Sequence, residues 1–156
     1  MSQKIKITAI VVLGLFLFLI DQVFKYLIMA GDRVNIGYGW LRIEKATNAG
    51  IAFGINFNLY LLIPLYVAVI AILLYYCVKK IKSGELNKFF PLSIVIWGAL
   101  SNFVDRVRFG YVVDYIYLKN FSVLNVADIM ITLGITYFIY VNFFINSKIE
   151  KHENNS

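Results

Sequence analysis

The feature that most constrains this chain is a run of 20 residues without a charged side chain, from Leu59 to Val78. An α-helix rises ~1.5 Å per residue, so a run of this length crosses the ~30 Å hydrocarbon core of a bilayer. Pro64 falls in the early turns of the run, where a proline costs a helix least. We therefore expect a transmembrane helix here.

Three further apolar runs have comparable length, beginning at Ile7, Phe89 and Ile129. With 60% apolar residues and a mean hydropathy of +0.74, the chain has too little polar surface for a soluble domain of 156 residues. We predict an all-α integral membrane protein with four transmembrane helices, at about 7–29, 59–78, 89–104 and 128–147. These helices belong to one membrane-embedded domain over 1–150, and residues 151–156 are expected to be a disordered tail.

The first run also has the basic start and apolar stretch of a signal peptide. Lys4 and Lys6 precede it, but no small-x-small cleavage site follows. If the helix continues through Asp21 and Lys25 to Met29, it is long enough to span a bilayer. We interpret this segment as an uncleaved helix.

Lysines are found near both ends of the chain and between residues 79 and 88. Cytoplasmic segments of membrane proteins carry an excess of Lys and Arg, and an even number of spans puts these three segments on one side. We predict that both termini are cytoplasmic and that segments 30–58 and 105–127 face outward. Topology, rather than nucleic-acid binding, then explains the net charge of +6.

The outer segment at about 31–57 has a different pattern. Residues 40–44, Trp-Leu-Arg-Ile-Glu, alternate between apolar and polar, which is typical of a half-buried strand. Gly31, Gly37 and Gly39 mark turns. We predict a small extracytoplasmic β-sheet on the membrane surface, with Trp40 at the interface.

The unusual polar residues fall at the outer ends of the predicted helices. Asp21 lies 14 residues after the start of the first run, which is roughly 21 Å into the bilayer. Lys25 is one helical turn further on and can pair with it. The others at this depth are Asn48, Asn102, Asp105, Arg106, Asp114, Asn125 and Asp128. Ionisable groups inside a membrane are expensive and usually functional, so this cluster is the candidate site.

These residues also have structural interpretations. Charges at helix ends often only mark the membrane boundary. Asp21 with Lys25 is as readily a structural ion pair as a substrate contact. Asp128 directly precedes an uncharged run and so has the position of a helix N-terminal cap. These structural interpretations explain each residue singly, but they do not explain why all of them gather at one depth.

The chemistry open to this cluster is limited by the residue types present. His152 is alone in the tail and Cys77 lies near the cytoplasmic end of a helix, so no Ser–His or Cys–His nucleophile is expected. Two neighbouring carboxylates can share one proton. The ionised member then takes a proton from water while the protonated member donates to a carbonyl oxygen. This is aspartyl peptide hydrolysis, but the residues alone do not say which two aspartates pair.

Four elements resemble, in order and spacing, those of the lipoprotein signal peptidase (signal peptidase II) family. They are Asp21-Gln22-x-x-Lys25, the run Asn-Ala-Gly-Ile-Ala-Phe-Gly at 48–54, the stretch 98–116 with Asn102, Asp105-Arg106 and Asp114, and Leu-Asn-Val-Ala-Asp at 124–128. This chain departs from the family pattern at four positions. Trp97 and Ser101 stand where glycines are usual, and Tyr115 and Leu124 stand where Phe is usual. The spacing of 14 positions from Asp114 to Asp128 is also short.

The resemblance implies a membrane aspartyl endopeptidase of the bacterial inner membrane. Its substrate would be a diacylglyceryl-modified prolipoprotein, cut just before the lipidated cysteine, with the active site near the outer face. Asp114 and Asp128 would be the catalytic pair. The residues that would shape the site or hold substrate are Asp21, Lys25, Asn48, Gly50, Asn102, Arg106 and Asn125. The resemblance implies no metal or organic cofactor and no nucleic acid, and a monomer in contact with membrane lipid is expected.

Two other functions fit four helices with intramembrane acids. A small proton- or cation-coupled transporter subunit would need an acid near the bilayer midplane, accessible from both sides. A non-catalytic membrane scaffold would need no pair of acids and would tolerate their replacement by Asn. The predicted gathering of the acids on one side favours the peptidase.

Overall fold

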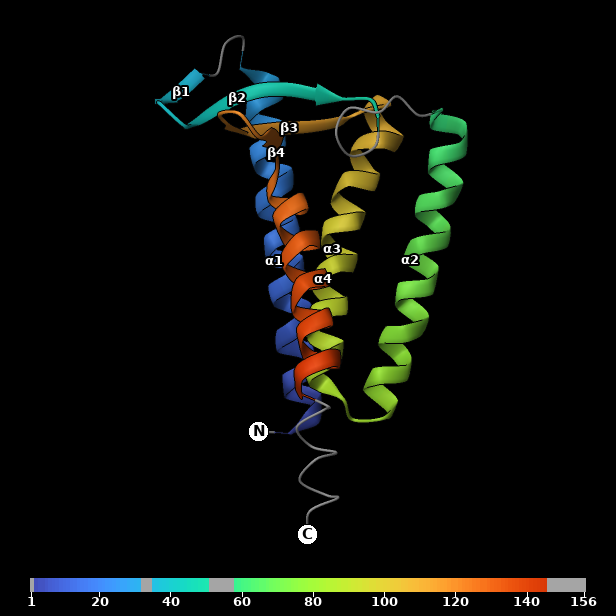
Figure 1. Cartoon of the computed structure of the whole chain (residues 1–156). Helices are drawn as coiled ribbons and strands as arrows, with labels where there is room; N and C mark the ends of the chain where they lie inside the picture. Colours follow the sequence, from blue (N-terminus) through green and yellow to red (C-terminus); the bar gives the residue numbers. More distant parts are fainter. Residues whose placement is uncertain (1, 32–34, 51–57, 146–156) are drawn as a thin grey trace.

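The computed structural model describes residues 2–31, 35–50 and 58–145, which form a helical bundle capped by a sheet (Figure 1). The helices are α1 (Gln3–Ala30), α2 (Leu59–Lys82), α3 (Leu86–Phe109) and α4 (Val126–Tyr140), and α4 continues as the π-helix η2 (Val141–Ile145). The strands are β1 (Asn35–Tyr38), β2 (Leu41–Asn48), β3 (Val112–Leu118) and β4 (Ser122–Leu124). A helix overlaps each of the four predicted ranges, and α3 extends five residues beyond its predicted end at 104.

Among the described residues, three helical segments are long and apolar enough to cross a membrane: Gln3–Ala30, Leu59–Lys82 and Val126–Phe144. Their large apolar side chains face outward, including Phe16, Leu61 and Leu133, so this surface suits lipid. The predicted fourth span is not confirmed, because α3 is not among them. The reason is that α3 is the central helix. It packs against α1, α2 and α4 and carries the buried polar residues of the site.

The four strands form one antiparallel sheet in the order β1-β2-β3-β4, which lies across one end of the bundle (Figure 1). The predicted region at 31–57 supplies only β1 and β2, and residues 51–57 lie outside the described part of the chain. The other half of the sheet is the hairpin of β3 and β4, which precedes α4 and was not predicted as strands. A bulge between Ile43 and Ala46 breaks the register where β2 crosses β3, opposite Tyr115.

The hairpin of β3 and β4 explains the short spacing between Asp114 and Asp128. Ile116 pairs with Leu124, so the chain turns at residues 119–121 and returns beside its own start. Asn120 takes the left-handed conformation that this turn needs (φ 61°). The hairpin therefore brings the first turn of α4 back beneath Asp114.

At the opposite end of the bundle, the turn between α2 and α3 lies beside the beginning of α1 and the end of α4 (Figure 1). Glu85 holds this turn, because its carboxylate pairs with Lys88 and Lys80 and accepts from Ser83. Hydrogen bonds from Lys88, Lys80 and Ser83 lower the pKa of Glu85 to about 2. The lysines near the N-terminus and those at 79–88, which were predicted to share one side, therefore lie at one end of the bundle, whereas Lys148 and Lys151 lie outside the described residues.

Trp97, one of the departures from the family pattern, is accommodated by a glycine on α1. A Cβ placed on Gly14 would overlap the Trp97 indole, so only glycine allows the two helices to meet here. Phe18 packs on the same ring, with centroids 5.7 Å apart. This contact fixes how α1 lies along α3. The predicted single domain over 1–150 stays a prediction, and the predicted tail at 151–156 lies outside the described residues.

Candidate active site

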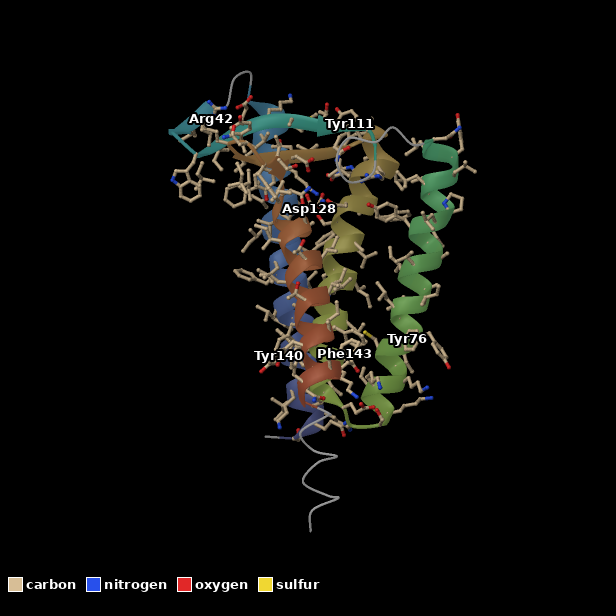
Figure 2. The ribbon with its side chains drawn as sticks, viewed as in Figure 1. Arg42, Tyr76, Tyr111, Asp128, Tyr140 and Phe143 are labelled. Atoms are coloured by element: carbon tan, nitrogen blue, oxygen red, sulfur yellow. The ribbon has the colours of Figure 1, made fainter. Side chains whose placement is uncertain are left out.

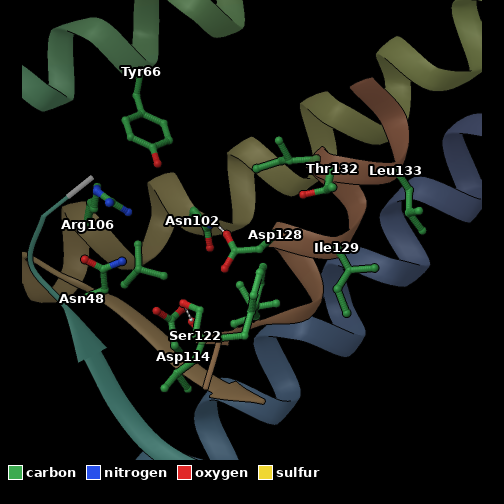
Figure 3. Close-up of a pocket in the computed structure, with 15 residues that line it drawn as sticks. Asn48, Tyr66, Asn102, Arg106, Asp114, Ser122, Asp128, Ile129, Thr132 and Leu133 are labelled. Atoms are coloured by element: carbon green, nitrogen blue, oxygen red, sulfur yellow. Dashed lines mark hydrogen bonds between the residues drawn. The ribbon is translucent and has the colours of Figure 1, made fainter. Parts of the chain in front are cut away.

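A pocket of about 520 Å³ lies directly beneath the sheet, between the ends of α2, α3 and α4 that are nearest the sheet (Figure 3). Figure 2 shows Asp128 at this level, close under the strands. One part of the lining is polar: Asn48, Tyr66, Asn102, Arg106, Asp114 and Asp128. The rest is largely apolar and includes Phe121, Ile129 and Leu133. The pocket therefore offers a polar interior beside a surface suited to hydrocarbon.

Asp114 and Asp128 enter this pocket from β3 and from the first turn of α4. Asn125 lies between them: its Nδ2 donates to Asp114 Oδ1 at 2.7 Å, and its Oδ1 accepts from the backbone N–H of Asp128 at 2.8 Å. Asp128 Oδ2 in turn accepts from the backbone N–H of Asn125 at 3.3 Å. This capping box orients Asp128 by the geometry of the helix start itself.

Asn102 on α3 completes the connection between the two carboxyl groups. Its Nδ2 donates to Asp128 Oδ1 at 2.8 Å, while its Oδ1 accepts from Asn125 Nδ2 at 3.1 Å. Asn125 is fully buried and Asn102 nearly so. Each carboxyl group is therefore held by a neutral amide.

The environment of Asp114 favours its protonated form. Its side chain is buried, and burial, followed by the charge of Asp128, raises the pKa of Asp114 from 3.8 to about 7. Lys25, Asn125 and Arg106 oppose this rise but do not cancel it. A carboxyl group that keeps its proton near neutral pH, beside a second carboxyl group, can act as a general acid.

A second carboxylate cluster lies behind the pocket, around Lys25. Its ammonium Nζ is 2.7 Å from Asp21 Oδ2 and 2.9 Å from Asp105 Oδ2. It also donates to Asn102 Oδ1 at 3.0 Å. The expected pairing of Lys25 with Asp21 is present, and Asp105 is an additional partner that sequence spacing did not indicate. We call Asp21, Lys25 and Asp105 the Lys25 cluster.

The Lys25 cluster fixes the backbone on both sides of Asp114. Asp105 Oδ2 accepts from the N–H of Val113 at 3.1 Å, and Asp21 Oδ1 accepts from the hydroxyl of Tyr115 at 2.8 Å. Asp21 Oδ1 also accepts from the N–H of Val126, at the start of α4. Burial and the neighbouring Asp21 raise the pKa of Tyr115, so its hydroxyl stays a donor. The cluster thus ties together the two elements that carry Asp114 and Asp128.

Arg106 lies on the opposite side of the pocket, next to the loop after β2. Its Nη2 donates to the carbonyl of Gly50 at 2.6 Å, and the Gly50 N–H is bound by Asn48 Oδ1 at 3.0 Å. The Nε and Nη1 groups of Arg106 are buried and have no hydrogen-bond partner among the described residues. Its guanidinium carbon is 5.1 Å from the centre of the Tyr66 ring. Within the described part of the chain, Arg106 therefore has N–H donors that are not used.

The predicted site residues are thus brought together, but not all at the pocket. Asn48, Asn102, Arg106, Asp114 and Asp128 line it, while Asn125 and Gly50 support them. Asp21 and Lys25 are buried outside the lining. The remainder of the predicted family motif, residues 51–54, lies outside the described residues.

Sequence reasoning missed Tyr66, and it missed the roles of Gln22, Ser101 and Tyr115. Tyr66 carries no signal, because it is one aromatic residue in an apolar helix. Ser101 and Tyr115 carried a signal as departures from the family pattern, and both place hydroxyls on Asp21, with the Ser101 hydroxyl 2.6 Å from Oδ2. Gln22 donates to Ser101 and Asp105.

Comparison with known proteins points in one direction. Residues 13–144 match the family described as Signal peptidase (SPase) II. The lipoprotein signal peptidase of Thermodesulfovibrio yellowstonii is 33% identical over 153 residues, which cover 91% of this chain and 98% of that protein. The lipoprotein signal peptidase of Halothermothrix orenii is 37% identical over 125 residues, covering 77% of this chain and 85% of that protein.

Solved structures agree with the sequence comparison. A bacterial membrane enzyme determined at 2.3 Å resolution superposes with a TM-score of 0.79 at 28% identity, covering 90% of both chains. A second bacterial membrane enzyme, at 1.9 Å resolution, gives a TM-score of 0.73 at 27% identity, covering 88% of this chain and 94% of that one.

Proposed function

This chain belongs to the signal peptidase II family, and we propose that it is an aspartic endopeptidase with Asp114 and Asp128 as its catalytic pair. It removes the signal peptide from prolipoproteins, cutting before the diacylglyceryl-modified cysteine. One observation carries the assignment of the pair. Of the aspartates in the described residues, Asp114 and Asp128 alone line the pocket, and one asparagine binds both.

The chemistry follows from one proton shared by the pair. The ionised carboxylate accepts a proton from water, and the resulting hydroxide attacks the scissile carbonyl carbon. The protonated carboxyl group donates its proton to the carbonyl oxygen as the tetrahedral intermediate forms. The C–N bond then breaks, the amine leaves with the proton taken from water, and the carbonyl proton returns to the pair.

We assign the remaining predicted site residues by their positions. Asn102 and Asn125 hold the two carboxyl groups, and Asp21 with Lys25 acts as a positioning pair rather than in direct contact with substrate. Asn48, Gly50 and Arg106 form the side of the pocket that receives the peptide main chain. The unpartnered N–H groups of Arg106 support this role, because buried donors normally bind something.

The proposal includes a topology. α3 is the fourth span, its polar side shielded by the other helices, and both termini face the cytoplasm of a bacterium. The pocket then opens at the outer leaflet, where the lipid-modified cysteine of a substrate lies. A reporter fused after the C-terminus that is active in the periplasm would contradict this arrangement. The transporter and scaffold alternatives are not favoured, because the family is a peptidase family.

The deciding experiment is cleavage by the purified full-length chain in lipid or detergent. The substrate is a prolipoprotein peptide with a diacylglyceryl cysteine, and the control is the same peptide without the lipid. We expect a product that begins at the lipidated cysteine, and no cleavage of the control. Failure to cut the lipidated peptide under conditions where the protein is folded would refute the function.

A further inference from the structure

A second cavity, of about 700 Å³, runs down the bundle between α2, α3 and α4. Its lining extends on α2 from Leu62 to Tyr76 and includes Leu92 on α3 and Phe138 on α4. Apart from two tyrosine hydroxyls, the lining is hydrocarbon. We call this cavity the α2 groove. It lies where α2 packs on α3 and stands apart from α4 (Figure 1).

The α2 groove adjoins the pocket that holds Asp114 and Asp128. Tyr66 and Ile131 line both cavities, so the junction lies between α2 and α4. Tyr66 is held by Phe103 and by Arg106, and its hydroxyl points toward the space between Arg106 and Asn102 (Figure 3). Within the described residues that hydroxyl has no hydrogen-bond partner. Tyr66 therefore stands at a boundary between polar and apolar space.

The length and chemistry of the α2 groove suit one extended apolar chain. Leu62 and Tyr76 are 14 residues apart on one helix, or roughly 21 Å. That exceeds the ~15 Å thickness of one leaflet of the hydrocarbon core, so an acyl chain that enters at the sheet end can lie along the groove over its length. The hydrocarbon walls offer almost no partner to the N–H and C=O groups of an extended peptide, whereas an acyl chain has no such groups to satisfy.

We propose that the α2 groove binds an acyl chain of the lipid-modified substrate, which reaches it from the catalytic pocket past Tyr66. The proposal rests on the proposed function, since it requires a lipidated cysteine at the pocket. At the junction, the Tyr66 hydroxyl donates to an ester carbonyl of the glyceryl group, the polar group that adjoins the acyl chain. Hydrocarbon gains little by moving from lipid into the groove. The groove therefore aligns the scissile bond more than it adds affinity.

The test fills the groove and compares substrates that differ only in their chains. Val69 lines the groove and is partly exposed, whereas Val67, two residues away on α2, does not line it. Val69→Trp and its matched control Val67→Trp are purified as full-length protein, checked for unfolding temperature, and assayed on dipalmitoyl and diacetyl forms of one prolipoprotein peptide. Ile72→Trp, one turn along the groove, provides a second filling variant should Val69→Trp fail to fold.

We expect Val69→Trp to lower kcat/KM for the dipalmitoyl peptide roughly tenfold, because a displaced chain misaligns the reacting bond. The diacetyl peptide and the Val67→Trp variant should change less than about twofold. Equal loss on both substrates would show that another part of the substrate occupies the groove, and no loss on either would show that it is unused. Both outcomes overturn the proposal. If wild type cleaves neither peptide, the proposed function itself fails.

The role of Tyr66 has its own pair of variants. Tyr66→Phe keeps the ring against Arg106 but removes the hydroxyl, and Tyr60→Phe makes the same change at an exposed position of α2 outside both cavities. We expect Tyr66→Phe to raise KM several-fold for both peptides, since both contain ester carbonyls. An unchanged KM would remove the hydroxyl from the proposal.

Discussion

Two groups of aspartates lie side by side at the end of the bundle that the sheet covers, and they differ in what surrounds them. In the Lys25 cluster, Asp21 and Asp105 share one ammonium group and accept further hydrogen bonds from Ser101, Tyr115, Gln22 and two backbone N–H groups. Within the described residues, Asp114 and Asp128 accept hydrogen bonds from amide and backbone donors alone, and they face a pocket. The same side chain is thus tied into a buried ion pair in one group and left open to a bound molecule in the other.

The comparison predicts that the largest loss of activity comes from the pocket pair. Asp114→Asn and Asp128→Asn each remove a group that exchanges protons, so we expect turnover to fall by on the order of a thousandfold or more. The double variant should be little worse than either single one, because the two residues act as one unit. Cleavage assays with a check of the unfolding temperature measure this. Substantial turnover by either single variant would refute the assignment.

In the Lys25 cluster, substitution should lower the stability of the fold first. Lys25→Met leaves two buried carboxylates without their cation, which costs on the order of 3–5 kcal/mol. We expect a large fall in unfolding temperature, with loss of activity following from loss of structure. Lys4→Met, at an exposed position on the same helix, is the matched control. If Lys25→Met unfolds like wild type, the cluster is only a marker of the membrane boundary.

The pH dependence of kcat/KM tests whether Asp114 and Asp128 share a proton. Because the folded-state pKa of Asp114 is raised to about 7, the shared proton is present below that pH and is lost as the pH rises through it. We expect kcat/KM to fall about tenfold per pH unit above this value. The unfolded chain binds this proton less tightly, so stability should also fall as the pH rises from 3.8 to about 7. Unfolding must therefore be recorded beside activity. A rate that rises steadily above pH 7 would contradict a shared proton.

The smallest effects should come from the hydroxyls that surround Asp21. Tyr115→Phe and Ser101→Ala each remove one hydrogen bond and leave the Lys25 pairing intact, so we expect losses of ~1 kcal/mol in stability. Activity should stay within a few-fold of wild type. Tyr117→Phe, on the same strand as Tyr115, is the control and should change neither quantity. A thousandfold loss of activity in Tyr115→Phe would place that hydroxyl in the chemistry.

The sequence predicts the parts of this molecule that depend on local patterns. Uncharged runs predict α1, α2 and α4, and a spacing of four residues predicts the pairing of Asp21 with Lys25. Strand β3 escapes detection because its first four residues are all buried, so apolar and polar positions do not alternate. Asp105 escapes as a partner of Lys25 because nothing local links α1 to α3.

The pairing of the proposed catalytic aspartates, Asp114 and Asp128, shows the same limit. Residue types alone indicate two carboxylates but not which two, because the hairpin turn and Asn125 decide that in three dimensions. The resemblance to a family indicated Asp114 and Asp128 as the pair, which local patterns had left open. Neither local patterns nor the family resemblance indicated Tyr66, because its place in the lining of both cavities depends on which helix faces α2.

The pairing of Asp21 with Lys25 also has a consequence for biosynthesis. Of the contacts made by the Lys25 cluster, this ion pair lies within a single helix, whereas Asp105, Ser101, Tyr115 and Val126 follow many residues later. A ribosome delivers α1 to the membrane before any of those partners has been synthesised. Until the later helices are made, Asp21 and Lys25 can neutralise each other. This pairing lowers the free-energy cost of inserting α1 into the membrane alone. The last helix, α4, supplies both Val126 and Asp128, so a half-synthesised chain in the membrane lacks the complete pair that we propose to be catalytic.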